Sequence, residues 1–194
     1  MTTTLVKAVL VVGAAAALTV SPAGAETIGM APHEKTLGAL MVGNREERIT
    51  RVAPLNMVGT TREVFVGSVA YGRNDTDSPA KLRIGYHMGC AVAFTGDSFG
   101  AEPDIYAISP GGDANPTNFG PVAELTLVPG TVETIKIAEI DMEPGQVAEM
   151  QIDDFHIVVN ACAGPATLRQ YTAVVSKTTG RLASAVVYGD STWM

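Results

Sequence analysis

The sequence predicts an all-β fold, and three observations carry that prediction. Bulky and small residues alternate along Ile84 to Thr95. Tyr86, Met88 and Cys90 share one face, and glycines and alanines share the other. Side chains alternate across a strand with a period of two, whereas a helix would scatter these residues around its axis. Short apolar runs separated by turn residues, typical of a sandwich or barrel, fill the rest of the chain. No long apolar stretch of helical type follows the first 25 residues.

Residues 1–25 are predicted to be a secretory signal peptide. Lys7 precedes an apolar run from Ala8 to Val20, and Ala23-Gly24-Ala25 supplies a site of small residues for cleavage after Ala25. A transmembrane helix is the alternative, but the run is shorter than the ~20 residues that a helix needs to span a bilayer. We therefore expect an exported mature chain, 26–194, that forms one domain.

The mature chain is acidic. Removal of Lys7 with the signal peptide takes the formal net charge from −7 to −8. A chain of this charge is a poor partner for nucleic acid and favours cations in any water-filled space that it lines. Without an apolar helix, a mature chain of this kind enters a membrane only as a β-barrel.

Two cysteines, Cys90 and Cys162, remain after export. An oxidising compartment favours a disulfide between them, which would close a loop of roughly 70 residues and stabilise the fold by about 4 kcal/mol. Two buried thiols are the alternative. Neither cysteine has a second ligand at metal spacing, so we expect no metal site there.

Turn signals divide the chain into predicted strands. The segment from Glu26 to Met57 is weakly patterned. Its apolar run Leu37–Val42 and the mixed charges of Asn44–Arg48 predict a short helix or loop with a solvated charge patch. Thr61–Tyr71 and Lys81–Thr95 flank a turn at Asn74–Pro79, which predicts a hairpin. The later strands are expected at Thr131–Ile140, Gln146–Ile152, Phe155–Cys162, Ala166–Ser176 and Ala183–Tyr188. Trp193 near the end is expected to pack onto the domain, with a membrane interface as the alternative.

A second hairpin is predicted across the loop-like composition of residues 96–128. Phe99–Ala107 and Phe119–Val128 each alternate, with an apolar face opposite a face that bears carboxylates, and Ser109–Pro116 forms the turn. Each arm has about the 9–11 residues of a tilted membrane strand. Prolines in the arms weigh against a regular ladder, and an exposed loop on a soluble sandwich is the alternative. The acidic residues of the arms are Glu102, Asp104 and Glu124.

Motifs for catalysis or cofactor binding are absent from the sequence. There is no glycine-rich phosphate loop, no nucleophile elbow and no paired metal-ligand motif. The stretch Asp153 to His156 contains potential ligands, but its neighbours point to opposite faces of a strand, so we interpret it as structural. We expect no enzyme activity and no cofactor, and a hydrolase with an unrecognised site is a weaker alternative.

The order and spacing of several segments resemble the MspA-like porins of mycobacteria. The strand Leu82–Gly89 is similar to that family's leucine-x-x-glycine-tyrosine-x-x-glycine strand. Further likeness lies in Pro129-Gly130, in Tyr188–Trp193 at the C-terminus and, toward the rhodococcal and nocardial branch, in His156-Ile157, Cys162–Ala166 and Arg169. The likeness covers most of the mature chain.

The resemblance implies a goblet-shaped assembly in an actinobacterial outer membrane. Each subunit would contribute a β-sandwich rim, 26–95 and 129–194, and one long hairpin, about 96–128, to a transmembrane β-barrel of eight hairpins. Partners would be outer-membrane lipids, further copies or a related porin chain, and small hydrophilic solutes and cations. One hairpin cannot close a barrel and an open edge cannot face lipid, so self-association is required.

The resemblance also places a ring of acidic residues at the hairpin tip, the narrowest point of the family's channel. Asp113 matches that position, although the family has neighbouring aspartates where this chain has Ser109 to Gly112. Asp104, Glu102 and Glu124 are the next candidates for lining the pore. A different class of function, a secreted β-sandwich that binds or adheres to surfaces, remains the alternative, and predicts a soluble monomer that never conducts.

Overall fold

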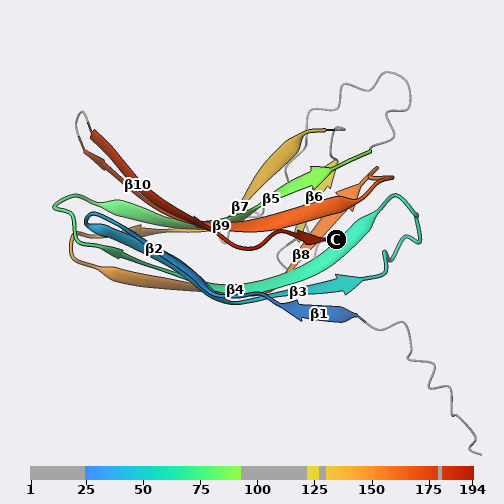
Figure 1. The fold of residues 1–194 in the computed structure, drawn as a ribbon, viewed down its shortest axis with the longest axis horizontal. Helices are drawn as coiled ribbons and strands as arrows, with labels where there is room; N and C mark the ends of the chain where they lie inside the picture. The colour runs from blue at the N-terminus through green and yellow to red at the C-terminus, as the bar shows by residue number, and fades with distance from the viewer. Residues whose placement is uncertain (1–24, 93–121, 127–129, 179–180) are drawn as a thin grey trace, which may run out of the picture.

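The chain forms two β-sheets that pack face to face, seen edge-on in Figure 1. The computed structural model describes residues 25–92, 122–126, 130–178 and 181–194. Every regular element in these ranges is a strand, and all but one of the strand pairs there are antiparallel. The prediction of an all-β fold with a sandwich is confirmed. The predicted signal peptide, residues 1–25, lies outside the described residues except for Ala25 and stays a prediction.

The two sheets differ in size and share the core between them. Sheet A contains, in spatial order, β1 (Glu26–Gly29) and β2 (His33–Leu37), which both pair with β3 (Leu40–Val52), then β4 (Arg62–Asn74), β8 (Val147–Asn160) and β6 (Val122–Thr126). Sheet B contains β10 (Arg181–Tyr188), β9 (Ala166–Thr178), β5 (Ala80–Cys90) and β7 (Val132–Met142), with β11 (Thr192–Trp193) also paired to β9.

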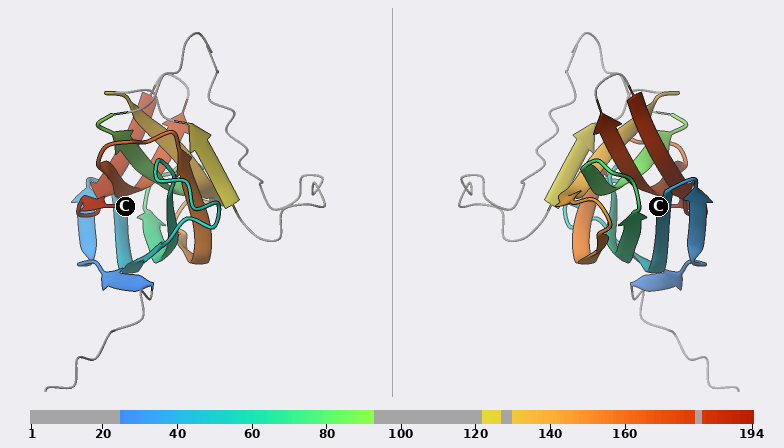
Figure 2. Two further views of the ribbon diagram at one scale, coloured as in Figure 1. Left: turned by 90° about the vertical axis from the view of Figure 1, so that its right-hand side faces the viewer. Right: turned by 90° about the vertical axis from the view of Figure 1, so that its left-hand side faces the viewer.

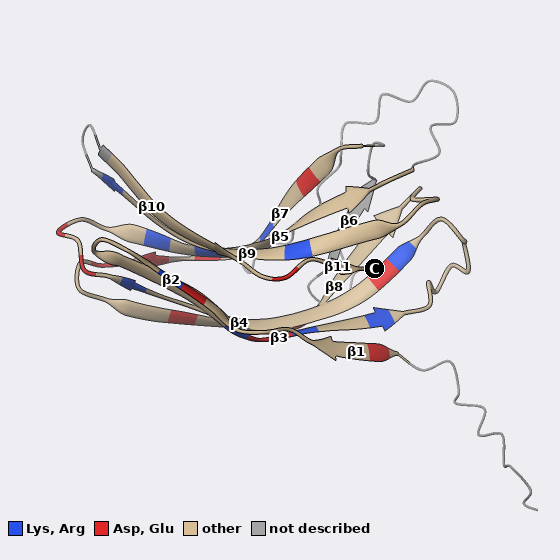
Figure 3. Ribbon diagram, viewed as in Figure 1, with Lys and Arg blue, Asp and Glu red and all other residues tan. Residues whose placement is uncertain are grey.

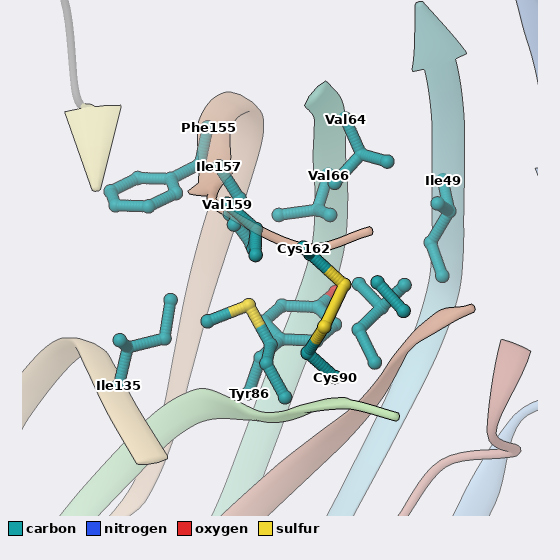
Figure 4. Packing of buried hydrophobic residues seen from close by; sticks show 13 residues of the cluster. Ile49, Val64, Val66, Tyr86, Cys90, Ile135, Phe155, Ile157, Val159 and Cys162 are labelled. Atoms are coloured by element: carbon teal, nitrogen blue, oxygen red, sulfur yellow. A yellow bond between two sulfur atoms is a disulfide. The ribbon is translucent and has the colours of Figure 1, made fainter. Parts of the chain in front are cut away.

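Strand β5 has the buried apolar face that its alternation predicts. Ile84, Tyr86, Met88 and Cys90 are all buried. Tyr86, Met88 and Cys90 pack with residues of sheet A such as Ile157, in a core that Figure 4 shows at close range, whereas Ile84 belongs to a second core cluster. The strand ends earlier than expected, at Cys90, and Val92 is exposed instead of sharing the buried face. Residues 93–95 lie outside the described part of the chain.

The predicted hairpin between the strands at residues 61–71 and 81–95 is wrong. Strand β4 pairs with β3 and β8 in sheet A, whereas β5 pairs with β7 and β9 in sheet B. The turn at 74–79 therefore crosses from one sheet to the other. The Asn74 amide donates to the Ser78 carbonyl at 2.8 Å and holds this crossing. Two strands alternate in the same way whether they pair in one sheet or lie in facing sheets. The alternation therefore could not distinguish a hairpin from a crossing between sheets.

The expected short helix or loop at residues 37–48 is also wrong, because β3 runs through the charge patch as a strand. Its pairing with β4 shifts register between Arg45 and Arg48, and Glu46 has a positive φ of 55°. Such a bulge inserts an extra residue into one strand and interrupts the alternation. The interruption hid the strand from a search for a period of two.

Two of the predicted strands form one continuous strand that contains a second bulge. The segments expected at 146–152 and 155–162 form the single strand β8, whose pairing with β4 shifts register opposite Val66 and Ser68. Asp154 at the bulge has a φ of 49°. The remaining strands predicted after residue 130 are confirmed as β7, β9 and β10.

The glycines on the outer face of β5 have different roles. A Cβ at Gly85 would collide with the carbonyl oxygen of Ile135 and lie 2.7 Å from the Tyr171 ring. At Gly89 the nearest atom would be Thr167 Oγ1, at an ordinary 3.6 Å. The close approach predicted for these small residues therefore holds at Gly85, where β7 is itself bulged.

We predict that Gly85→Ala destabilises the sandwich by about 1–3 kcal/mol, because the added methyl group meets backbone that cannot move aside easily. The matched control Gly89→Ala has room for its methyl group and should leave the melting temperature nearly unchanged. Thermal denaturation followed by circular dichroism compares the two variants. Equal melting temperatures would contradict the role assigned to Gly85.

Candidate functional site: the insertion end of the sandwich

The two ends of the predicted barrel segment lie side by side at one end of the sandwich. The chain is described up to Val92, just beyond β5, and from Gly130, just before β7; of the residues between them, the structure describes 122–126, which form β6 on sheet A. The backbone N–H of Gly130 donates to the carbonyl of Cys90 at 3.3 Å. We call this the insertion end; it lies on the right in Figure 1 and faces the viewer in the left view of Figure 2. A hairpin in residues 93–129 requires ends that meet in this way.

A disulfide secures the insertion end. Cys90 and Cys162 are joined, with Cα atoms 5.8 Å apart, and both are buried beside Tyr86 (Figure 4). The backbone N–H of Ala163 donates to the Val92 carbonyl at 2.8 Å, and that of Cys162 donates to the Thr60 carbonyl at 2.7 Å. The predicted disulfide is confirmed. It ties the last residue of β5 in sheet B to the segment that follows β8 in sheet A.

Most of the predicted pore-lining carboxylates lie beyond what the structure describes. Asp113, Asp104 and Glu102 fall in residues 93–121, outside the described residues. Glu124 lies in β6, which pairs in parallel with β8 and places Glu124 opposite Val158. The prediction that residues near Glu124 form a strand is confirmed, and its described partner is the sandwich. The assignment of these four residues to a pore stays a prediction.

A buried polar cluster between the two sheets was not anticipated from the sequence. The Asn44 amide of β3 donates to Gln170 Oε1 of β9 at 2.9 Å, and the Gln170 amide donates to Ser68 Oγ of β4 at 2.8 Å. Glu47 of β3 is buried beside them, with Oε2 3.4 Å from the Asn44 amide nitrogen. Gly189 makes room for this carboxyl, because a Cβ there would lie 2.6 Å from Glu47 Oε2.

Burial raises the pKa of Glu47 from 4.5 to about 7. The neighbouring Tyr86 hydroxyl opposes this shift, and the negative charge of Asp190 adds to it. Among the described residues, neither Glu47 Oε1 nor the Tyr86 hydroxyl completes a hydrogen bond. The charge patch at Asn44–Arg48 was the one sequence signal for this cluster. Its bulge turns Asn44 and Glu47 inward, whereas composition favoured a solvated face.

The stretch Asp153 to His156 makes its side-chain contacts with β3 and β4 of sheet A. His156 Nε2 lies 3.2 Å from Glu63 Oε2, and the His156 ring stacks on the Phe65 ring with centroids 4.5 Å apart. Asp153 pairs with Arg48. Within the described ranges, no three His, Cys, Asp or Glu side chains gather as a metal site.

A family model described as MspA matches residues 38–192. The match covers most of the chain, from the start of β3 through β11. The chain belongs to the MspA family. Members of the MspA family are channel-forming porins of the outer membrane of mycobacteria and their relatives, so the predicted resemblance is confirmed and general porin function follows from membership. No curated protein matches the chain.

Membership of the MspA family agrees with the strand-rich structure. In the part of the chain that the structure describes, no helix is long and apolar enough to cross a bilayer. Trp193, near the C-terminus, pairs through its backbone with Thr167, and the residue is 59% exposed. The backbone of Trp193 therefore packs onto the domain as expected, whereas the residue as a whole stays largely exposed.

We predict that replacing both Cys90 and Cys162 by alanine destabilises the sandwich by about 4 kcal/mol, because the disulfide closes a long loop with a sequence separation of 72. Thermal denaturation of the variant and of the wild type measures the loss. Adding a reductant should lower the melting temperature of the wild type and leave that of the variant unchanged. A variant as stable as the oxidised wild type would contradict the anchoring role.

We predict that stability falls as pH rises from about 4.5 to about 7, because folded Glu47 keeps a proton that the unfolded chain releases. The loss is on the order of 3 kcal/mol, which is complete above the folded pKa. Glu47→Gln should flatten this pH profile and raise the melting temperature at pH 8. The neighbouring Glu46→Gln, at an exposed position, is the control and should leave the profile unchanged. Parallel profiles for wild type and Glu47→Gln would refute the assignment.

Proposed function

We propose that this chain is one subunit of a porin that forms a water-filled, cation-preferring channel for small hydrophilic solutes in an actinobacterial outer membrane. The observation that carries the proposal is the meeting of Cys90 and Gly130 at the insertion end, where a disulfide and a hydrogen bond hold the two chain ends that flank the proposed hairpin. Of that hairpin, the structure describes residues 122–126, which lie in β6 on sheet A. A long hairpin that inserts into a membrane needs a rigid base, and membership of the MspA family supplies the context.

The proposed channel is an oligomer. One hairpin cannot close a barrel, and unpaired backbone groups at an open edge cannot face hydrocarbon. Eight hairpins, one from each subunit, would satisfy every backbone donor and acceptor in the membrane. Assembly with a related porin chain is compatible with the same geometry. The signal peptide at residues 1–25 would deliver the chain to the export pathway.

Selectivity in this proposal is electrostatic. A water-filled lumen spares solutes the loss of their hydration shells, and rings of carboxylates attract cations. Symmetry repeats each lumen carboxylate once per subunit, so a single acidic residue becomes a ring. We assign the narrowest ring to Asp113 and further lining positions to Asp104, Glu102 and Glu124. The net charge of −7 for the whole chain acts in the same direction.

A secreted, soluble β-sandwich module is not favoured, because membership of a channel-forming family gives the chain a function that this alternative lacks. The chain has no proposed catalytic role. Single-channel recording with the purified mature protein tests the proposal directly. We expect discrete conductance steps in planar bilayers. Protein that stays monomeric and never conducts, in detergent and in lipid, would overturn it.

We predict that Asp113→Asn combined with Asp104→Asn lowers the cation preference of the channel, because the substitution removes two rings of negative charge. Reversal potentials in a salt gradient across a planar bilayer measure the change. The matched control, Glu149→Gln with Asp153→Asn, removes two carboxylates that pair with Arg45 and Arg48 on the sandwich. An unchanged reversal potential in the first variant would refute the lining assignments.

A further inference from the structure

The loop between β3 and β4 carries apolar side chains in the open at the insertion end. Leu55 and Met57 are 88% and 91% exposed, and Val58 is exposed beside them. Residues 53–61 contain no charged side chain, and Figure 3 shows this loop uncharged between the basic ends of the two strands. Exposed apolar groups gathered in this way mark a surface that contacts another apolar phase.

The loop is held in one conformation by its own hydrogen bonds. The backbone N–H of Leu55 donates to Glu63 Oε1 at 3.1 Å, and the Asn56 amide donates to Thr61 Oγ1 at 3.0 Å. Met57 adopts a positive φ of 54°, which a residue with a Cβ rarely adopts without such support. The apolar side chains are therefore presented outward, and the loop does not fold them back onto the sandwich.

The same loop is tied directly to the base of residues 93–129. The carbonyl of Thr60 accepts from the backbone N–H of Cys162, and Cys162 is disulfide-bonded to Cys90. Trp193 lies at this end as well, since Met194 donates its N–H to Ala166, the partner of Cys90 on β9. The apolar loop is thus connected to the end of β5 through one hydrogen bond and one disulfide.

We infer that Leu55, Met57, Val58 and Trp193 form an apolar collar that enters the lipid interface around the base of the channel. This inference rests on the proposed function, because a membrane-spanning hairpin turns the insertion end toward the bilayer. Tryptophan, with an apolar ring and a polar N–H, is enriched at the depth of the lipid headgroups.

The chain contains a single tryptophan, so Trp193 reports on the collar without any substitution. The test reconstitutes the full-length mature protein in phosphatidylcholine vesicles whose acyl chains carry bromine near the headgroup end. Bromine quenches tryptophan that it touches. We expect Trp193 to lose much of its emission in these vesicles compared with vesicles of unbrominated lipid.

Two variants locate the contact within the molecule. Both carry Trp193→Phe, and one adds Leu55→Trp in the collar. The other adds Leu182→Trp near the start of β10, at the opposite end of the sandwich, where the native leucine is 67% exposed. Leu55→Trp should be quenched by brominated lipid, whereas Leu182→Trp should keep its emission. Equal quenching at the two positions would overturn the inference.

Dye release from the same vesicles measures channel activity separately. Active channels with unquenched Trp193 would overturn the collar and leave the proposed function standing. Unquenched emission in vesicles that lies at short wavelength would mean that protein covers Trp193, which also overturns the inference. Quenching without dye release would support lipid contact by the collar and count against the proposed channel.

Discussion

The structure depends on one covalent constraint, the bond between Cys90 and Cys162. It joins the last residue of a central strand in one sheet to the segment that follows a central strand in the other. Both cysteines belong to the buried apolar cluster between the sheets, so the bond adds a covalent tie to a region that is already well packed. The same bond fixes the end of β5, from which the chain continues to Val92.

The core also contains a cluster of polar side chains, whose burial opposes the stabilising effect of apolar packing. Glu47, Asn44, Ser68 and Gln170 lie between sheets that are otherwise apolar, and a buried carboxyl is unfavourable when it is charged. Hydrogen bonds between the sheets satisfy the buried amides of Asn44 and Gln170. Glu47 avoids a buried charge because it stays protonated below its raised pKa of about 7. Polar contacts of this kind restrict how two sheets can slide over each other, since only one register satisfies them. Stability at high pH is lowered as a consequence.

Membership of the MspA family joins these local observations into one molecule. The sandwich supplies a rigid body, the insertion end brings the two ends of one segment together, and the apolar loop beside it faces the same direction. Each feature alone is compatible with a soluble domain. Their coincidence at a single end of the fold is what favours a membrane at that end.

Several properties could be predicted from the sequence because they depend on local pattern. Alternation along β5 located its buried face, turn residues located most of the later strands, and two cysteines in a chain expected to be exported predicted their own disulfide. Alternation failed to predict continuous strands at Asn44–Arg48 and at Asp153-Asp154, where bulges occur. One inserted residue reverses which of the following side chains face the core. The proposed pore-lining carboxylates were chosen by alternation and resemblance. Three of them lie outside the described residues, and Glu124 lies in β6, opposite Val158 of β8.

The sequence by itself determined the class of the fold, the disulfide and the family, since each follows from residue types and their spacing. Only the tertiary structure decided which strands share a sheet, because a turn between two alternating strands is compatible with a hairpin or with a crossing between layers. It also decided that Glu47 is buried, and that the loop at Leu55 lies beside Cys162. These are contacts between residues far apart in the chain, and no local pattern records them.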